Sequence, residues 1–197
     1  MGATPLTQQL SQQLWRLFPW DSAAAEGQPF SPSYVPPKQG SGRFDLGGRP
    51  LVLYLAESPS HAVAEKIQRY RGQVLDWPEL SEFGRPLSLV QATLTLADPD
   101  LLADLCDPAQ LSRYGCRPDE LMSRDLTRTQ GVSRRLYDQG LAGFRWWSAL
   151  SGDWHSTVLY LDRVTASGKL EYGAPTPLDL DSPALTDAAA ALSIAVG

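Results

Sequence analysis

The feature that most restricts the fold of this chain is a short apolar run at residues 51–55 (LVLYL), which stops abruptly at a Ser-Pro break. A continuous apolar run of this length between break residues is typical of a buried strand. Ser58 is suited to cap a following helix, Pro59 suits its first turn, and Gly72 can end it. The sequence therefore predicts a buried strand that passes directly into a helix.

Shorter patterns on either side predict more strands, but these do not alternate regularly with helices. Apolar or alternating residues predict strands at residues 14–18, 87–96, 143–148 and 156–161. Residues 101–139 show helical spacing interrupted by Pro and Gly, which predicts several short helices. This order favours an α+β fold over a doubly wound α/β fold: a single domain with small antiparallel or mixed sheets flanked by short helices.

Two segments differ in composition from the rest of the chain. Residues 21–42 are rich in Gly, Ser and Pro and predict a long loop, of the kind that binds ligands or is disordered. No basic residue follows Lys169, and prolines precede an Ala-rich end. We therefore expect a folded domain over residues 1–170 and a loose or peripheral tail, acidic and rich in Pro and Ala and able to form a short helix, over residues 171–197.

The overall charge and hydropathy exclude some classes of partner. The chain of 197 residues has a formal net charge of -5, with 22 acidic against 17 basic residues, so we expect no direct nucleic-acid partner. No apolar stretch approaches the roughly 20 residues of a membrane span, and the N-terminus is polar, so we expect a cytoplasmic protein with no membrane partner. Only Lys38, Lys66 and Lys169 are lysines, and arginine, which dominates the basic residues, suits bidentate capture of phosphate.

Several familiar chemistries lack their sequence signatures. Cys106 and Cys116 lie ten residues apart with no CxxC, and His61 and His155 are the only histidines, so no metal site is expected. The dinucleotide-binding GxGxxG, the phosphate-binding GxxxxGKS/T and the hydrolase GxSxG are all absent.

A spaced set of polar and aromatic residues remains: Arg43, Tyr54, Glu65 and Ser148. Each has a purely structural explanation as well. Glu65 lies four residues before Arg69, the favourable orientation for an ion pair on a helix surface. A tyrosine in an apolar strand usually belongs to the core, an arginine beside an aspartate can stiffen a loop, and a serine can end a strand. Individually, these residues do not identify a chemistry.

Taken together, their order resembles the RES family, named for its Arg, Glu and Ser residues and known chiefly for toxins of toxin–antitoxin pairs. Residues 42–65 (GRFD…LVLYLAESP…AVAE) resemble the central signature, in which an Arg-aromatic pair precedes a strand and a helix carrying Glu. Trp15 and Arg16 resemble part of its opening strand, and residues 143–148 (GFRWWS) resemble its late strand ending in Ser. The resemblance implies a fold similar to that of ADP-ribosyltransferases, with residues 1–170 as a RES-like catalytic domain.

The resemblance also implies a substrate and a partner. The substrate is NAD+, whose nicotinamide–ribose bond is cleaved, and no separate cofactor is expected. The partner is an antitoxin of the Xre/MbcA type that blocks the pocket. Ordinary glycoside cleavage uses two carboxylates, but nicotinamide leaves from a pyridinium that is already cationic, so one carboxylate suffices.

Each residue of the set then takes a role that the resemblance implies. Glu65 would hold the nicotinamide ribose and stabilise the oxocarbenium-like charge as the bond lengthens. Arg43 would bind the pyrophosphate, with Arg16 as a second candidate for the same role. Tyr54 would orient the nicotinamide ring, and Ser148 would donate a hydrogen bond to the nicotinamide amide or the ribose.

The acceptor of the ADP-ribose cation decides the class of reaction. Water makes the protein a glycohydrolase and inorganic phosphate makes it a phosphorolase, and either reaction depletes NAD+. A protein or RNA acceptor would make it an ADP-ribosyltransferase, and a third alternative is a non-catalytic binding module of the same fold. The sequence contains no motif that reads an acceptor, and depletion of NAD+ is the favoured hypothesis.

Overall fold

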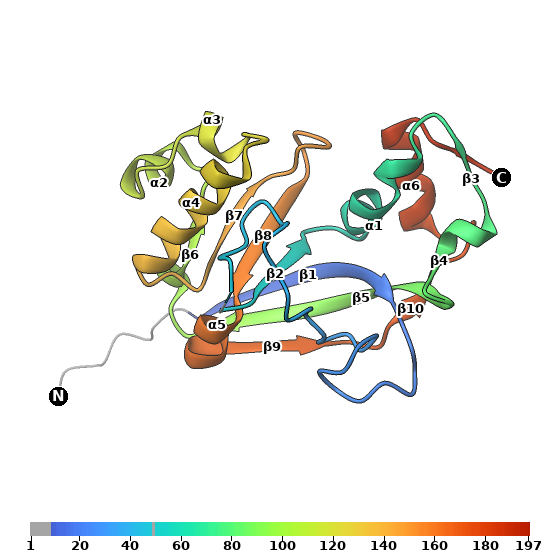
Figure 1. Cartoon of the computed structure of the whole chain (residues 1–197), viewed down its shortest axis with the longest axis horizontal. Coiled ribbons are helices and arrows are strands. Elements are labelled where there is room, and N and C mark those ends of the chain that lie inside the picture. Colours follow the sequence, from blue (N-terminus) through green and yellow to red (C-terminus); the bar gives the residue numbers. More distant parts are fainter. Residues whose placement is uncertain (1–8, 49) are drawn as a thin grey trace.

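A computed structural model describes residues 9–48 and 50–197 of the chain (Figure 1). The strands are β1 (Leu10–Pro19), β2 (Val52–Ala56), β3 (Val74–Leu75), β4 (Ser81–Glu82), β5 (Arg85–Leu96), β6 (Leu102–Asp104), β7 (Gly143–Trp147), β8 (His155–Tyr160), β9 (Gly168–Tyr172), β10 (Thr176–Pro177) and β11 (Ala195–Val196). The α-helices are α1 (Pro59–Ile67), α2 (Pro108–Arg113), α3 (Pro118–Leu121), α4 (Leu126–Asp138), α5 (Leu161–Ser167) and α6 (Pro183–Leu192). The 3₁₀ helices are η1 (Gln68–Tyr70), η2 (Trp77–Leu80) and η3 (Pro99–Leu101). Within the described residues, no helix is both long and apolar enough to cross a membrane.

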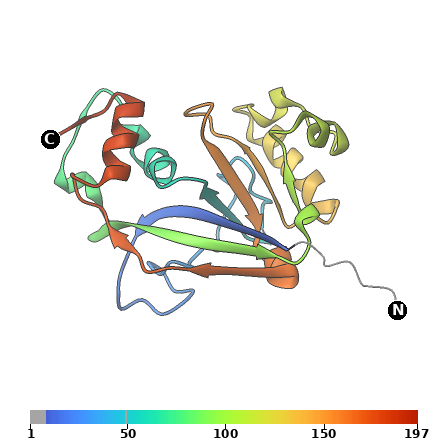
Figure 2. The same cartoon turned by 180° about the vertical axis from the view of Figure 1, so that it is seen from behind.

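Nine strands join in one mixed sheet with the central order β10-β5-β1-β2-β8-β7-β6, and β4 and β9 also pair with β5. β1 and β5 form the longest antiparallel ladder, of ten residue pairs starting with Leu10 opposite Leu96. β1 and β2, by contrast, share a single pair, Trp15 opposite Ala56. The sheet therefore divides at this point into two halves, one built on β1, β5 and β9 and the other on β2, β8 and β7, whose strands run in different directions (Figures 1 and 2).

Two groups of helices cover the sheet. The helices α2, α3 and α4 lie beside β7 and β8, and the core on that side contains Phe44, Phe144 and Tyr160 (Figure 1). Helix α1 follows β2 directly and packs against α6 in the second group. A third cluster, which includes Leu55 and Leu94, fills the space between the two halves of the sheet. The junction of β2 with α1 thus lies between the two groups of helices.

Most of the elements predicted from the sequence are present. The predicted strands correspond to β1, β2, β5, β7 and β8, and the interrupted helical region forms α2, α3 and α4. Helix α1 begins as expected, because the hydroxyl of Ser58 accepts a hydrogen bond from the backbone N–H of His61 and proline occupies the first turn. Strand β6, which pairs in parallel with β7, was not predicted, because a strand of three residues is too short to show a pattern.

The expectation of a loose C-terminal tail is wrong. Residues 168–172 form β9 beside β5, and α6 packs on α1 with Leu185, Ala188 and Leu192 buried. These side chains are spaced by three and four residues, which gives α6 an apolar stripe along one face that the overall composition of the segment conceals. The predicted division at residue 170 falls within β9.

Candidate active site

A cleft of about 490 Å³ opens where the two halves of the sheet meet α1, and we call it the main cleft. Its volume is within the range typical of small-molecule sites. Its walls come from β1, the loop before β2, β2 itself, α1 and β7. The polar and aromatic side chains that line it include Trp15, Arg16, Arg43, Tyr54, Glu65, Trp146 and Ser156. The predicted residues Arg16, Arg43, Tyr54 and Glu65 therefore share one cavity.

Glu65 lies on α1 with its carboxylate held by three hydrogen-bonding groups. Oε1 lies 3.0 Å from Nε2 of His61 and accepts a hydrogen bond of 3.1 Å from the hydroxyl of Ser148. Oε2 accepts a hydrogen bond of 3.2 Å from the side-chain amide of Gln68. Burial alone would raise the pKa of Glu65, but these hydrogen bonds and the charge of His61 outweigh it, so the pKa lies below its usual value. The carboxylate is therefore ionised at neutral pH.

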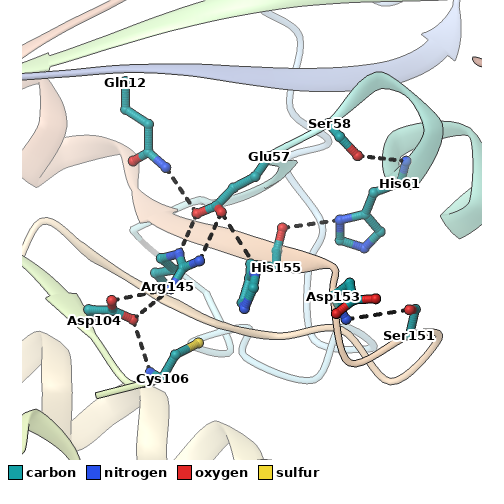
Figure 3. Close-up of polar contacts among 10 residues, drawn as sticks. All are labelled: Gln12, Glu57, Ser58, His61, Asp104, Cys106, Arg145, Ser151, Asp153 and His155. Carbon is teal, nitrogen blue, oxygen red and sulfur yellow. Dashed lines mark hydrogen bonds and ion pairs between the residues drawn. The ribbon is translucent and has the colours of Figure 1, made fainter.

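His61 lies one turn before Glu65 on α1 and supports its carboxylate. Its Nδ1 lies 3.1 Å from the backbone carbonyl oxygen of His155, and a carbonyl can only accept, so Nδ1 donates in this contact. Figure 3 shows how the ring of His61 faces this carbonyl. The imidazole is fully buried and stacks on Trp154, with ring centroids 5.4 Å apart. The ring is therefore held between the carbonyl of His155 and the carboxylate of Glu65.

His61 is not among the site residues predicted from the sequence. Arg69, four residues after Glu65, is the ion-pair partner that the helical spacing suggests, but Arg69 lies 3.7 Å from Glu82 instead. The signal that could have revealed the contact is the position of His61 four residues before Glu65, on the same face of α1.

Arg43 is held at the opposite wall by backbone and aromatic contacts. Its guanidinium donates to the carbonyl oxygens of Leu121 and Ser123 at the end of α3 and lies 4.6 Å from the ring centre of Trp146. Burial lowers the pKa of Arg43, and the negative charge of Glu65 opposes this effect. Among the described residues, neither Nε of Arg43 nor Nε1 of Trp146 has a hydrogen-bond partner, although both atoms are buried. These two buried donors therefore lack a hydrogen bond within the described part of the protein.

Tyr54 presents its ring to the main cleft while its hydroxyl is fully used elsewhere. The hydroxyl donates to Oδ1 of Asp45 at 2.8 Å and accepts from the backbone N–H of Phe44 at 2.9 Å. Burial, and then the neighbouring Asp45, raise the pKa of Tyr54 well above its usual value. Oδ2 of Asp45 in turn accepts from the N–H groups of Gly40 and Gly42, at 2.8 and 2.7 Å. A Cβ at Gly42 would lie 2.5 Å from Asp45, so only glycine fits this turn.

Ser148 and Arg16 are placed differently with respect to the main cleft. The hydroxyl of Ser148 accepts from the N–H of Leu150 at 3.1 Å and donates to Glu65, and Ser148 is outside the lining of the main cleft. Arg16 lines the cleft from β1 and donates to the carbonyl of Pro32 at 2.9 Å. Burial lowers the pKa of Arg16. Ser148 therefore contacts the site through Glu65, and Arg16 forms part of its wall.

A cluster of charged and polar side chains fixes Glu57, which lies just before α1 (Figure 3). Arg145 of β7 donates to both carboxylate oxygens of Glu57, at 2.6 and 3.1 Å, and to those of Asp104, at 3.1 and 3.2 Å. Gln12 of β1 donates to Glu57 at 3.0 Å, and Nδ1 of His155 lies 3.8 Å from the same carboxylate. Burial alone would lower the pKa of Arg145, but the two carboxylates raise it above its usual value. The cluster ties the β2–α1 junction to β1, β6, β7 and β8.

Metal and cysteine chemistry find no support in the described part of the chain. Within residues 9–48 and 50–197, no three or more His, Cys, Asp or Glu side chains are grouped to hold a metal ion. Both cysteines are free, and burial raises the pKa of Cys106 to about 12, which disfavours the reactive thiolate.

The fold and the main cleft define a class of protein: an α+β domain in which an ionised glutamate, on the helix that follows a central strand, shares a cleft with arginine and aromatic side chains. The family model of the RES domain matches residues 13–181, and the chain belongs to this family. The fold is similar to that of a chain in the crystal structure of the M. tuberculosis MbcT–MbcA toxin–antitoxin complex, with a TM-score of 0.54 and 18% identity over 86% of this chain and 85% of that chain. The comparison with curated proteins gives no match. The predicted family and the α+β fold are thus confirmed.

Proposed function

We propose that the protein is an enzyme that cleaves the nicotinamide–ribose bond of NAD+ and thereby depletes it. The observation that supports this most directly is that Glu65 is the only carboxylate among the described residues lining the main cleft. A single ionised carboxylate matches a leaving group that needs no acid. Membership of the RES family, whose resemblance implied this substrate, supports the same conclusion.

The proposed reaction breaks the bond between C1′ of the ribose and the pyridinium nitrogen. The bonding electron pair stays with nicotinamide, which leaves as a neutral molecule, while positive charge grows on the ribose. The carboxylate of Glu65 stabilises that charge, and a preorganised electrostatic contact of this kind contributes about 3–4 kcal/mol. His61 and Ser148 hold the carboxylate in place, so we assign Ser148 a positioning role rather than a direct contact with substrate.

The other residues of the main cleft bind and orient the substrate in this proposal. Arg43 takes the pyrophosphate through its guanidinium, and Arg16 approaches the same anion from β1. The ring of Tyr54, whose hydroxyl is held by Asp45, offers a flat surface for nicotinamide.

The acceptor is tested by the products. Purified protein is incubated with NAD+ with and without inorganic phosphate, and free nicotinamide and the ribose product are measured. Hydrolysis gives ADP-ribose and one proton, phosphorolysis gives a phosphorylated ADP-ribose, and transfer leaves labelled ADP-ribose on a protein or RNA from a lysate. Glu65→Gln, which keeps the size of the side chain, should abolish nicotinamide release. Absence of both nicotinamide release and NAD+ binding would overturn the proposal and favour a non-catalytic module.

We further propose that a protein antitoxin controls this activity. The structural neighbour with a similar fold is part of a toxin–antitoxin complex, and an enzyme that consumes NAD+ without control would kill its host. The gene for this chain should then be toxic when expressed alone, and Glu65→Gln should relieve the toxicity. Equal toxicity of the two forms would contradict the link between growth arrest and catalysis.

A further inference from the structure

A second cavity of about 360 Å³ lies beside the main cleft, and we call it the loop cavity. Its walls come from the end of β1, from residues 29–36 of the long loop and from the turn between β4 and β5. Figure 1 shows this loop leaving β1 and returning to β2. Arg16 lines both cavities, so the two cavities are adjacent.

Aromatic rings from three separate segments line the loop cavity. They are Phe18 of β1, Phe30 and Tyr34 of the loop, and Phe83 of the β4–β5 turn. The rings of Phe30 and Phe83 are tilted by 48° with centroids 6.3 Å apart. Phe83 is 76% exposed, although it is a large apolar side chain. Aromatic rings around a cavity of this size can stack on a flat ring system.

The backbone at the rim of the loop cavity is strained. Phe30 has φ 71° and Phe83 has φ 54°, in the left-handed region that bulky residues rarely adopt. Strain of this kind clusters at ligand sites, where the surrounding structure maintains it. Both strained residues line the loop cavity with their aromatic side chains.

Ser31 supplies an unused polar group in this aromatic setting. The residue is 1% exposed, and its hydroxyl has no hydrogen-bond partner among the described residues. A buried hydroxyl without a partner costs free energy in the unliganded protein, and a ligand that bonds to it removes that cost. A hydroxyl can both donate and accept, which suits a heterocycle that carries both kinds of group.

Arg16, which lines both cavities, indicates which chemical group would join the two ends of a ligand that spans them. Its guanidinium lies 5.5 Å from the ring centre of Phe18 and is fixed by its hydrogen bond to the carbonyl of Pro32. A fixed guanidinium favours an anionic group such as a phosphate. The ligand that satisfies both cavities is therefore a flat heterocycle joined through phosphate to a group at Glu65.

We propose that the loop cavity binds the purine base of the dinucleotide, with the pyrophosphate passing Arg16 and the nicotinamide ribose at Glu65. This inference rests on the proposed function, because it takes the dinucleotide as the ligand. The base stacks on the exposed ring of Phe83, the tilted ring of Phe30 contacts the side of the base, and the hydroxyl of Ser31 bonds to its edge.

The test measures the two halves of the ligand separately. Adenosine monophosphate represents the purine half and nicotinamide mononucleotide the other half, and the affinity of each for the full chain is measured by calorimetry. Phe83→Ala should weaken the binding of adenosine monophosphate about tenfold or more, as expected for loss of a stacked ring. Ser31→Ala should weaken it several-fold while leaving the thermal stability equal or higher, because the lost hydroxyl has no partner in the free protein. The matched control is Trp77→Ala, another exposed aromatic, which lines neither cavity.

The outcomes separate this inference from the proposed function. Binding of adenosine monophosphate that responds to Ser31→Ala and Phe83→Ala supports the loop cavity as the purine site, whether or not NAD+ is cleaved. Failure of the wild-type chain to bind adenosine monophosphate overturns the inference. So does equal weakening of both mononucleotides, which would indicate a general disturbance of the loop. Nicotinamide release with unchanged purine binding in these variants leaves the proposed function standing and removes the purine site.

Discussion

His61 provides the most direct test of the chemistry in the main cleft. Its Nε2 lies 3.0 Å from Oε1 of Glu65, its Nδ1 donates to the carbonyl of His155, and its ring stacks on Trp154. His61→Phe would keep a flat ring in this buried position and remove both ring nitrogens. The variant therefore isolates the effect of the imidazole contact on the carboxylate.

The size of the effect follows from the contact that is lost. A hydrogen bond to a charged group contributes about 1.5–3 kcal/mol, and losing it disfavours the ionised form of Glu65, so the pKa of Glu65 should rise. The Glu65 side chain is 46% exposed, and screening by solvent favours the lower end of this range. In the wild-type protein the pKa lies below its usual value, so activity should fall only in acid. In the variant the acid limb should move to a higher pH.

The assay is the pH dependence of kcat/KM for nicotinamide release, with a carbon NMR titration of Glu65 as a readout that needs no turnover. The matched control is Arg69→Ala, which removes a cation four residues from Glu65 that contacts Glu82 instead. The lowered pKa also stabilises the folded state above the unfolded pKa of Glu65, and this contribution is lost as the pH falls through the folded pKa. An unchanged acid limb and an unchanged titration in folded His61→Phe would refute the support of Glu65 by His61.

Three further changes test the structure around the site. Gly42→Ala should destabilise the fold by about 1–3 kcal/mol in thermal unfolding, because its Cβ would lie 2.5 Å from Asp45; an unchanged melting temperature would contradict the tight turn. Arg145→Met should cost about 2–3 kcal/mol in urea unfolding, because it leaves the 23%-exposed carboxylate of Glu57 without its main partner; the cost is below that of a fully buried pair. Leu185→Ala should cost about 2–5 kcal/mol by the same measurement, and a negligible loss would restore the idea of a loose tail.

The central part of the site could be predicted because its determinants are local. The apolar run of β2, the Ser58 cap and the helix that positions Glu65 follow one another directly in the sequence, so the strand–helix junction is readable without knowledge of the rest of the fold. Arg43 precedes this strand and Tyr54 lies within it. Their convergence on one cavity follows from the turn that Asp45 organises.

The parts that were missed depend on contacts between distant segments. The ring of His61 is oriented by the carbonyl of His155, 94 residues away in the chain. The role of α6 depends on the facing surface of α1, and the spacing of its apolar residues was hidden by an Ala-rich composition. Ser148 was placed at the site, but the sequence alone could not show that its hydroxyl is directed at Glu65 rather than at the cleft.

Glu65 and Arg43 are anchored by different parts of the molecule, which predicts different kinetic effects when each anchor is disturbed. Helix α1 is fixed by the Glu57–Arg145 cluster at its start, by the carbonyl of His155 and by α6 along its side. Arg43 is instead held by carbonyl groups at the end of α3 and by the ring of Trp146. A carboxylate that stabilises developing charge acts mainly in the transition state, whereas a phosphate-binding arginine also binds the ground state. Displacement of α1 should therefore lower kcat, and loss of Arg43 should raise KM as well.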